Sequence, residues 1–157
     1  MSRGVVIRFQ PEADEQLRAI WTVLATARLP SLSQHTHGRH APHLSLVVAA
    51  SMSNERAADA VVGLPQPRLI DFEAVGYFPQ GVVHLVAVPN RELLDLQRRV
   101  PATLLLANAM TQPWPASQPG EWSPHVTLAY GVSPQDLAAA VPLITSALPL
   151  TCPVSEL

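Results

Sequence analysis

Two pentapeptides, PHLSL and PHVTL, repeat one residue pattern in the two halves of this chain: proline, histidine, an apolar residue, a hydroxyl residue and leucine. Because side chains alternate across a β-strand, we expect His43 and Ser45 on one face of one strand, and His125 and Thr127 on one face of another. The imidazole and the hydroxyl of each pair then lie about 7 Å apart, a span that one phosphate group and its hydrogen bonds can bridge. The pattern therefore predicts two matching binding strands.

Two histidines and two hydroxyls suit the opening of a phosphate ester without a metal. The reaction needs a base that takes a proton from water and an acid that protonates the departing oxygen. An imidazole has an ordinary pKa of about 6.5, so one histidine can be neutral while another is protonated. Ser45 and Thr127 can donate hydrogen bonds to the phosphate oxygens that gain charge. Both assignments of acid and base to His43 and His125 remain open, because the repeated pattern makes the two equivalent.

A histidine-rich stretch just before the first motif suggests a different chemistry. His35, His37 and His40 resemble the His-x-His-x-Asp-His metal motif of metallo-β-lactamase-like hydrolases, and short histidine-rich tracts can bind metals. Arg39 stands where that motif has aspartate, and its guanidinium would repel a divalent cation. We therefore expect no metal and no other cofactor, and keep a zinc hydrolase as the less favoured alternative. Arg39 becomes a candidate phosphate contact instead.

The elements that must position these residues follow the same order in both halves of the chain. Apolar residues that alternate or form short β-branched runs predict strands, and apolar residues at helical spacing, after caps such as Ser53 and Asn90, predict helices. Pro101 is expected to kink or break its helix. A repeated order usually marks a duplicated unit, so we predict one domain over 1–157, with pseudo-repeats at about 4–78 and 82–157. The predicted strands cover 4–9, 43–50, 68–78, 82–88, 125–131 and 151–157, and the predicted helices cover 11–29, 53–64, 90–109 and 133–148.

The two His-x-Ser/Thr motifs resemble those of the two-histidine (2H) phosphoesterase superfamily, in particular its bacterial branch of RNA 2′,3′-cyclic phosphodiesterases, also labelled 2′-5′ RNA ligases. The resemblance covers nearly the whole chain. It implies an α/β (α+β) fold in which a bilobal, duplicated unit places two small, mainly antiparallel sheets around a central cleft, with the helices outside. It also implies metal-independent opening of 2′,3′-cyclic phosphates, or of 2′-5′ linkages, with a 2′-phosphate as the favoured product.

The resemblance further implies roles for individual residues. His43 and His125 would be the catalytic acid–base pair, and Ser45 and Thr127 would hold the phosphate oxygens. Two positions depart from the family pattern: Ser45 replaces the commoner threonine, which the family tolerates, and Tyr130 stands where many members carry a basic residue. The second departure leaves the end groups of the substrate open. A non-catalytic nucleotide- or RNA-binding module with the same fold is the main alternative to an enzyme.

Aromatic side chains near the second motif could stack on a nucleobase. Trp122 and Tyr130 are the candidates for this contact, and Trp114 belongs to the same proline-rich loop as Trp122, a loop that could cover the cleft. Packing in the core or in a lid is the competing interpretation for each aromatic residue. His84, within a predicted strand, is interpreted as a structural histidine, and Cys152 as a cysteine without disulfide or catalytic role.

Composition limits the partners. The net charge is −2 and all 10 basic residues are arginine, so no broad basic surface is available for a long polyanion. We expect RNA termini or small nucleotides that carry a 2′,3′-cyclic phosphate as substrates, and a monomer without a protein partner. The N-terminal residues lack a signal-peptide pattern, and no apolar run is long enough for a membrane span. The sequence therefore predicts a soluble, cytoplasmic hydrolase.

Overall fold

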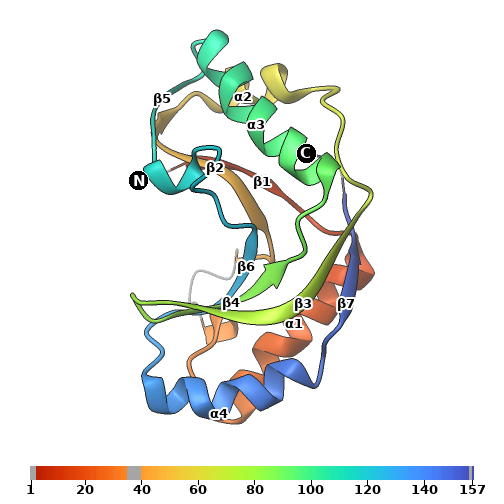
Figure 1. Cartoon of the computed structure of the whole chain (residues 1–157), viewed down its shortest axis with the longest axis vertical. Helices are drawn as coiled ribbons and strands as arrows, with labels where there is room; N and C mark the ends of the chain where they lie inside the picture. The colour runs from red at the N-terminus through yellow and green to blue at the C-terminus, as the bar shows by residue number, and fades with distance from the viewer. Residues whose placement is uncertain (1–2, 35–39, 156) are drawn as a thin grey trace.

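Strands run through the middle of the molecule and helices cover its two ends, in a computed structural model that describes residues 3–34, 40–155 and 157. Figure 1 shows α2 and α3 at one end and α1 and α4 at the other. The α-helices are α1 (Pro11–Thr26), α2 (Asn54–Val61), α3 (Arg91–Leu106) and α4 (Pro134–Thr145), with short 3-10 helices η1 (Leu32–Gln34) and η2 (Pro115–Ser117). The strands are β1 (Arg3–Ile7), β2 (Leu44–Met52), β3 (Leu69–Phe78), β4 (Val82–Ala87), β5 (Met110–Pro113), β6 (His125–Ala129) and β7 (Leu150–Pro153).

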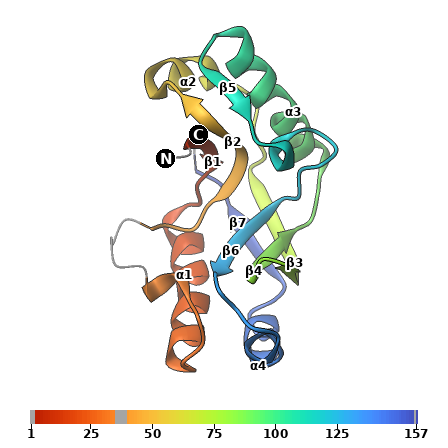
Figure 2. The same cartoon turned by 90° about the vertical axis from the view of Figure 1, so that its left-hand side faces the viewer.

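Hydrogen bonds join the strands in the order β1-β2-β6-β4-β3-β7, with β5 paired to β2, and every named pair is antiparallel. The predicted α/β class, with antiparallel strands and outer helices, is confirmed. The sequence predicts two small sheets, but β2 and β6 pair at Leu44 and Val126 and so connect all strands into one sheet. Both residues are fully buried, so the junction lets the core continue beneath both motif strands. Figure 2 shows β2 and β6 side by side.

Each half of the chain contributes to both ends of the molecule. Within the first half, β1 pairs with β2, but β2 also accepts β5 from the second half. The first-half strand β3 lies between β4 and β7 of the second half. The helices follow the same exchange, since α1 contacts α4 and α2 contacts α3. The repeated order of strand, helix, strand, helix and strand is present, with β5 added in the second half, which is consistent with duplication of one unit.

Short polar side chains fix where the helices begin. The expected caps are confirmed: Ser53 Oγ accepts a hydrogen bond from the backbone N–H of Arg56 (3.5 Å), and Asn90 Oδ1 accepts one from Leu93 (2.8 Å). Such caps satisfy N–H groups that have no partner inside the helix. The N-terminal ends of α2 and α3 are thereby set. A separate finding is that none of the helices in the described ranges is long and apolar enough to cross a lipid bilayer.

Two local predictions need correction. Of the predicted kink or break at Pro101, the break is contradicted, because α3 runs continuously from Arg91 to Leu106. A proline removes one helical hydrogen bond, but Leu96, Val100 and Leu104 are fully buried on the same helix, and this packing holds the helix together. The sequence predicts no strand between 109 and 125, and the MTQP of β5 has no apolar alternation. Its pairing with the edge of β2 makes it a strand.

Candidate functional site

The two repeated motifs meet at the junction of β2 and β6. Because the antiparallel register pairs Leu44 with Val126, it places His43 opposite Thr127 and Ser45 opposite His125. These four side chains are half-buried, whereas their neighbours Leu44, Leu46, Val126 and Leu128 are buried in the core. The histidine of each motif therefore faces the hydroxyl residue of the other motif, on the face of the sheet that is turned away from the core.

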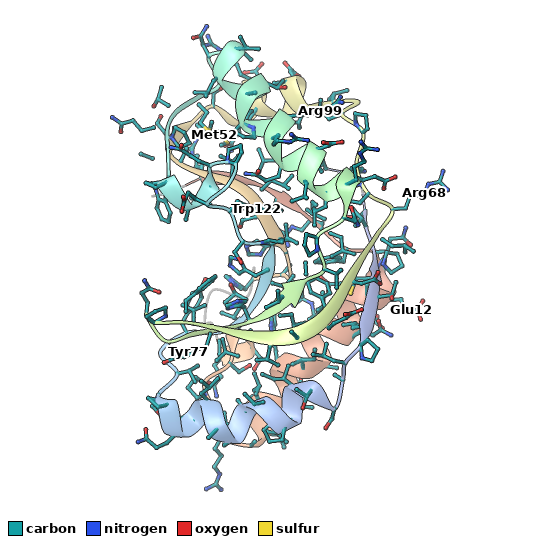
Figure 3. The ribbon with its side chains drawn as sticks, viewed as in Figure 1. Glu12, Met52, Arg68, Tyr77, Arg99 and Trp122 are labelled. Carbon is teal, nitrogen blue, oxygen red and sulfur yellow. The ribbon has the colours of Figure 1, made fainter. Side chains whose placement is uncertain are left out.

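One pocket of about 410 Å³ contains all four motif residues. The rest of its lining comes from β2, the end of β3 and the turn after it, the loop before β6 and the residue after β6. Figure 3 shows Trp122, one of the lining residues, on the side of the molecule that carries α3. The residues that line the pocket are His43, Ser45, Val48, Phe78, Gln80, Trp114, Ala116, Ser117, Glu121, Trp122, Ser123, His125, Thr127 and Tyr130. A volume of this size suits a small ligand such as a nucleotide.

Both motif histidines are oriented by the same local hydrogen bond. The Nδ1 of His43 lies 2.9 Å from the carbonyl oxygen of Ala41, and the Nδ1 of His125 lies 2.7 Å from that of Ser123. A carbonyl oxygen can only accept, so each Nδ1 carries the proton. In the neutral ring Nε2 is then the nitrogen that can accept a proton, and in the charged ring it is the nitrogen that can release one.

The surroundings of the two histidines make them different. Burial, first of all, and the charge of His43 lower the pKa of His125 below its usual value of 6.5, while the hydrogen bond to the Ser123 carbonyl acts in the opposite direction. The rings of Phe78 and His84 also lie against His125, each with ring centroids 5.0 Å away. The environment therefore favours the neutral form of His125, the form that can act as a base.

The loop between β5 and β6 forms a fixed wall of the pocket. The indole Nε1 of Trp122 donates to the carbonyl oxygen of Ser45 at 2.8 Å. The backbone N–H of Trp114 donates to Val48 O at 2.8 Å, and the N–H of Val48 donates to Ser117 Oγ at 2.9 Å. The loop thus satisfies the edge of β2 beside the first motif. The loop that the sequence suggests as a cover of the cleft is hydrogen-bonded to β2, at one side of the pocket.

A residue of α3 that the sequence analysis does not identify anchors this loop by a hydrogen bond. Gln97 lies on α3, is almost fully buried, and its Nε2 donates to the carbonyl oxygen of Ser117 at 2.7 Å. A buried amide needs hydrogen-bond partners, and a glutamine on the apolar face of a predicted helix was the available signal. Phe78, at the end of β3, also lines the pocket.

The other predicted site residues have different outcomes. Trp122 and Tyr130 line the pocket, and Tyr130 is 50% exposed. Arg39, His35 and His37 lie outside the described residues, so the phosphate contact and the rival metal site both stay predictions. Within the described part of the chain, no group of three or more His, Cys, Asp or Glu side chains could hold a metal ion.

This chain is similar to known proteins in sequence and in fold. The family model for the 2′-5′ RNA ligase superfamily matches residues 9–157. A structure of E. coli LigT complexed with 3′-AMP has 19% sequence identity and a TM-score of 0.54, covering 82% of this chain and 71% of that chain. A second, complexed with NADP+, has 18% identity and a TM-score of 0.51, covering 80% and 69%. Kluyveromyces marxianus Usb1 has 10% identity and a TM-score of 0.43, covering 94% and 88%. No curated protein matches the sequence significantly.

Proposed function

Because the chain belongs to the 2′-5′ RNA ligase superfamily, we propose that it is a metal-independent phosphodiesterase that opens 2′,3′-cyclic phosphates on RNA ends or small nucleotides. The superfamily supports a phosphodiesterase or RNA-processing role in general. One observation carries the finer proposal: the two His-x-Ser/Thr motifs lie antiparallel in one pocket, each histidine opposite the other motif's hydroxyl. The 3′-AMP named for E. coli LigT is a ribonucleotide, as the proposed substrates are, and carries a phosphomonoester, as the proposed product does.

The proposed mechanism consists of two proton transfers around phosphorus. The neutral Nε2 of His125 takes a proton from water as the water oxygen bonds to phosphorus. The bond from phosphorus to one ribose oxygen breaks, and the protonated His43 gives its Nε2 proton to that oxygen. Ser45 and Thr127 donate hydrogen bonds to the non-bridging oxygens, which gain charge in the transition state. The product is a phosphomonoester on one ribose oxygen and a free hydroxyl on the other.

Phosphorus NMR tests this function directly. The purified protein is incubated with 2′,3′-cyclic mononucleotides, and the resonance of the five-membered cyclic phosphate is expected to be replaced by that of a phosphomonoester. The position of the new resonance separates a 2′-phosphate from a 3′-phosphate, and the family resemblance favours the 2′ product. If the protein bound these nucleotides without converting them, the proposal would give way to a non-catalytic binding module.

Metal independence is a separate expectation. Neither proton transfer nor charge stabilisation in the proposed mechanism needs a metal ion, so turnover should persist in excess EDTA. The double variant His35→Ala/His37→Ala should retain activity within about threefold, since general acid–base catalysis by His43 and His125 does not use them. Loss of turnover in EDTA, with recovery on addition of zinc, would instead favour the zinc hydrolase.

The pocket also indicates the charge of the substrate. Of the described residues in its lining, none is Lys or Arg, and Glu121 is a carboxylate. The aromatic rings of Trp114 and Tyr130 are about half exposed there, as a surface for stacking on a base requires. We infer that the pocket itself holds one base and one singly charged phosphodiester, because a second phosphate inside it would meet the Glu121 carboxylate with no Lys or Arg among the described lining residues; further phosphates of an RNA end would lie outside the pocket.

Substrates that differ by one phosphate test this selectivity. A 5′-phosphate added to a 2′,3′-cyclic mononucleotide is expected to lower kcat/KM, and Tyr130→Arg should recover about 3- to 5-fold for that substrate, the size of an exposed ion pair. Leu106→Arg, at an exposed position on α3, is the matched control for added charge. Equal kcat/KM for both substrates in the unmodified protein would contradict the inferred selectivity.

A further inference from the structure

A third histidine lies beneath the pocket, against one of the two motif histidines. On β4, His84 is directly opposite Thr127 of β6, and Val86 is opposite His125. Residues diagonal to one another on neighbouring strands are within reach of an aromatic side chain, and the His84 and His125 ring centroids are 5.0 Å apart at an angle of 62°. The register places the His84 side chain on the same face of the sheet as Thr127 and His125, and with only 3% of it exposed it contacts His125 while covered from solvent.

Phe78 completes a cluster of three rings. It stacks on His84, with centroids 4.1 Å apart and planes at 23°, and meets His125 edge-on at 5.0 Å. The ring of His125 thus contacts two rings that also contact each other. Stacked and edge-to-face contacts of this kind are favourable and restrict orientation. His43 instead meets the ring of His40, with centroids 5.9 Å apart, so the cluster of Phe78 and His84 distinguishes the second motif from the first.

The position of His84 depends on a glycine in the neighbouring strand. Gly76 pairs with His84 across β3 and β4. A Cβ atom added to Gly76 would lie 2.1 Å from Nε2 of His84, far closer than two non-bonded heavy atoms can approach. The backbone of Gly76 therefore makes the space in which the His84 ring lies, and any larger residue there would push that ring aside.

The His84 ring works by shape and not by charge. Burial, and next the charge of His125, lower the pKa of His84 from 6.5 to about 4, so the ring is neutral where the proposed reaction would run. Its Nδ1 lies 3.4 Å from the Val82 carbonyl oxygen. This is the same two-residue relation that orients His43 and His125.

We propose that His84 is a positioning residue for His125. Together with Phe78 it holds the imidazole so that Nδ1–H keeps the Ser123 carbonyl and Nε2 stays directed to the reacting atoms, and Gly76 is required for this arrangement. The inference rests on the proposed role of His125 in proton transfer. A residue that acts through another is expected to change kcat more than KM, because it does not contact the substrate.

Nitrogen NMR of the imidazole tests the inference without any turnover. In the unmodified protein, at a pH where His125 is neutral, its ¹⁵N shifts should report a single tautomer protonated at Nδ1. His84→Ala should give averaged shifts from two tautomers and lower kcat about 10- to 100-fold, the cost of slight misplacement, with KM within about twofold. His84→Phe, which restores a ring, should recover both. Unchanged shifts and kcat in His84→Ala, with only a lower Tm, would overturn the proposal.

A double-mutant cycle tests the role of Gly76. Gly76→Ala alone should disturb the His125 shifts as His84→Ala does, because the new Cβ displaces the His84 ring. In the His84→Ala background the same change should have little further effect, since the ring is absent. Val83→Ala, on the core face of β4, is the control: it should lower Tm and leave the shifts alone. If the effects of the two substitutions on the His125 shifts were additive, the proposed contact of Gly76 with His84 would be contradicted. If the shifts changed as expected but the protein turned over no cyclic phosphate, the positioning of His125 would be supported and the proposed function refuted.

Discussion

Replacing either His43 or His125 with alanine is expected to lower kcat for cyclic phosphate opening by at least about 100-fold, the usual contribution of one general acid or base. The Nδ1–H of each histidine donates to a backbone carbonyl oxygen. The substitution therefore removes the Nε2 atom that would transfer the proton. The double variant should lose less than the product of the two single losses, because the two transfers act in one step. Steady-state kinetics with a 2′,3′-cyclic mononucleotide measures all three.

The pH profile and the hydroxyl variants sharpen this prediction. Protonation of His125 removes the base, so kcat/KM should fall as the pH falls through the pKa of His125, with a midpoint below 6.5 because burial lowers that pKa. Ser45→Ala and Thr127→Val should each reduce the stabilisation of the transition state by about 1 to 3 kcal/mol, as for the loss of a hydrogen bond to a charged group. Thr22→Val, on the exposed face of α1, is the matched control. Near-normal turnover in either histidine variant would refute the assignment.

The candidate site could be predicted closely from the sequence because its signal is local. Alternation within five residues is enough to put His43 with Ser45, and His125 with Thr127, and the repeat identifies these two among six histidines. The contact between the motifs depends on a strand pairing across 82 positions of sequence, Leu44 with Val126. Only the resemblance to a family, and not any local rule, placed both motifs at one cleft.

What the sequence did not predict depends on tertiary contacts. The strand β5 has a polar sequence and exists because it pairs with β2, so propensity gives no signal for it. Pro101 remains helical because of buried neighbours. The sequence of its own strand favours a structural role for His84. Its contact with His125 depends on the diagonal register of β4 and β6 and on the absence of a side chain at Gly76. Each of these features combines residues from different elements, which periodicity along one segment cannot detect.

Linear 3′-5′ DNA is expected to be inert, with a rate at least about 1,000-fold below that of RNA ending in a cyclic phosphate. In a 2′,3′-cyclic phosphate both ester oxygens belong to one ribose, so the acid can protonate the departing oxygen while the base activates water for in-line attack. DNA lacks the 2′-hydroxyl, so it cannot form a 2′,3′-cyclic phosphate. A 2′-5′ oligoadenylate has the ribose hydroxyl next to its phosphodiester, and we expect turnover of it to exceed that of DNA.

The comparison is made with four substrates of equal concentration: a 2′,3′-cyclic mononucleotide, a short RNA with a cyclic phosphate end, 2′-5′ oligoadenylate and a DNA oligomer. Binding of the DNA is measured separately, so that inertness reports chemistry and not lack of contact. With a net charge of −2, the affinity for the RNA should fall with salt by a slope of only about one or two phosphates, because the pocket holds one phosphodiester and the bases add stacking. Cleavage of DNA at a comparable rate, or no reaction with either cyclic phosphate, would show that the two histidines do not act on a ribose 2′,3′-cyclic phosphate.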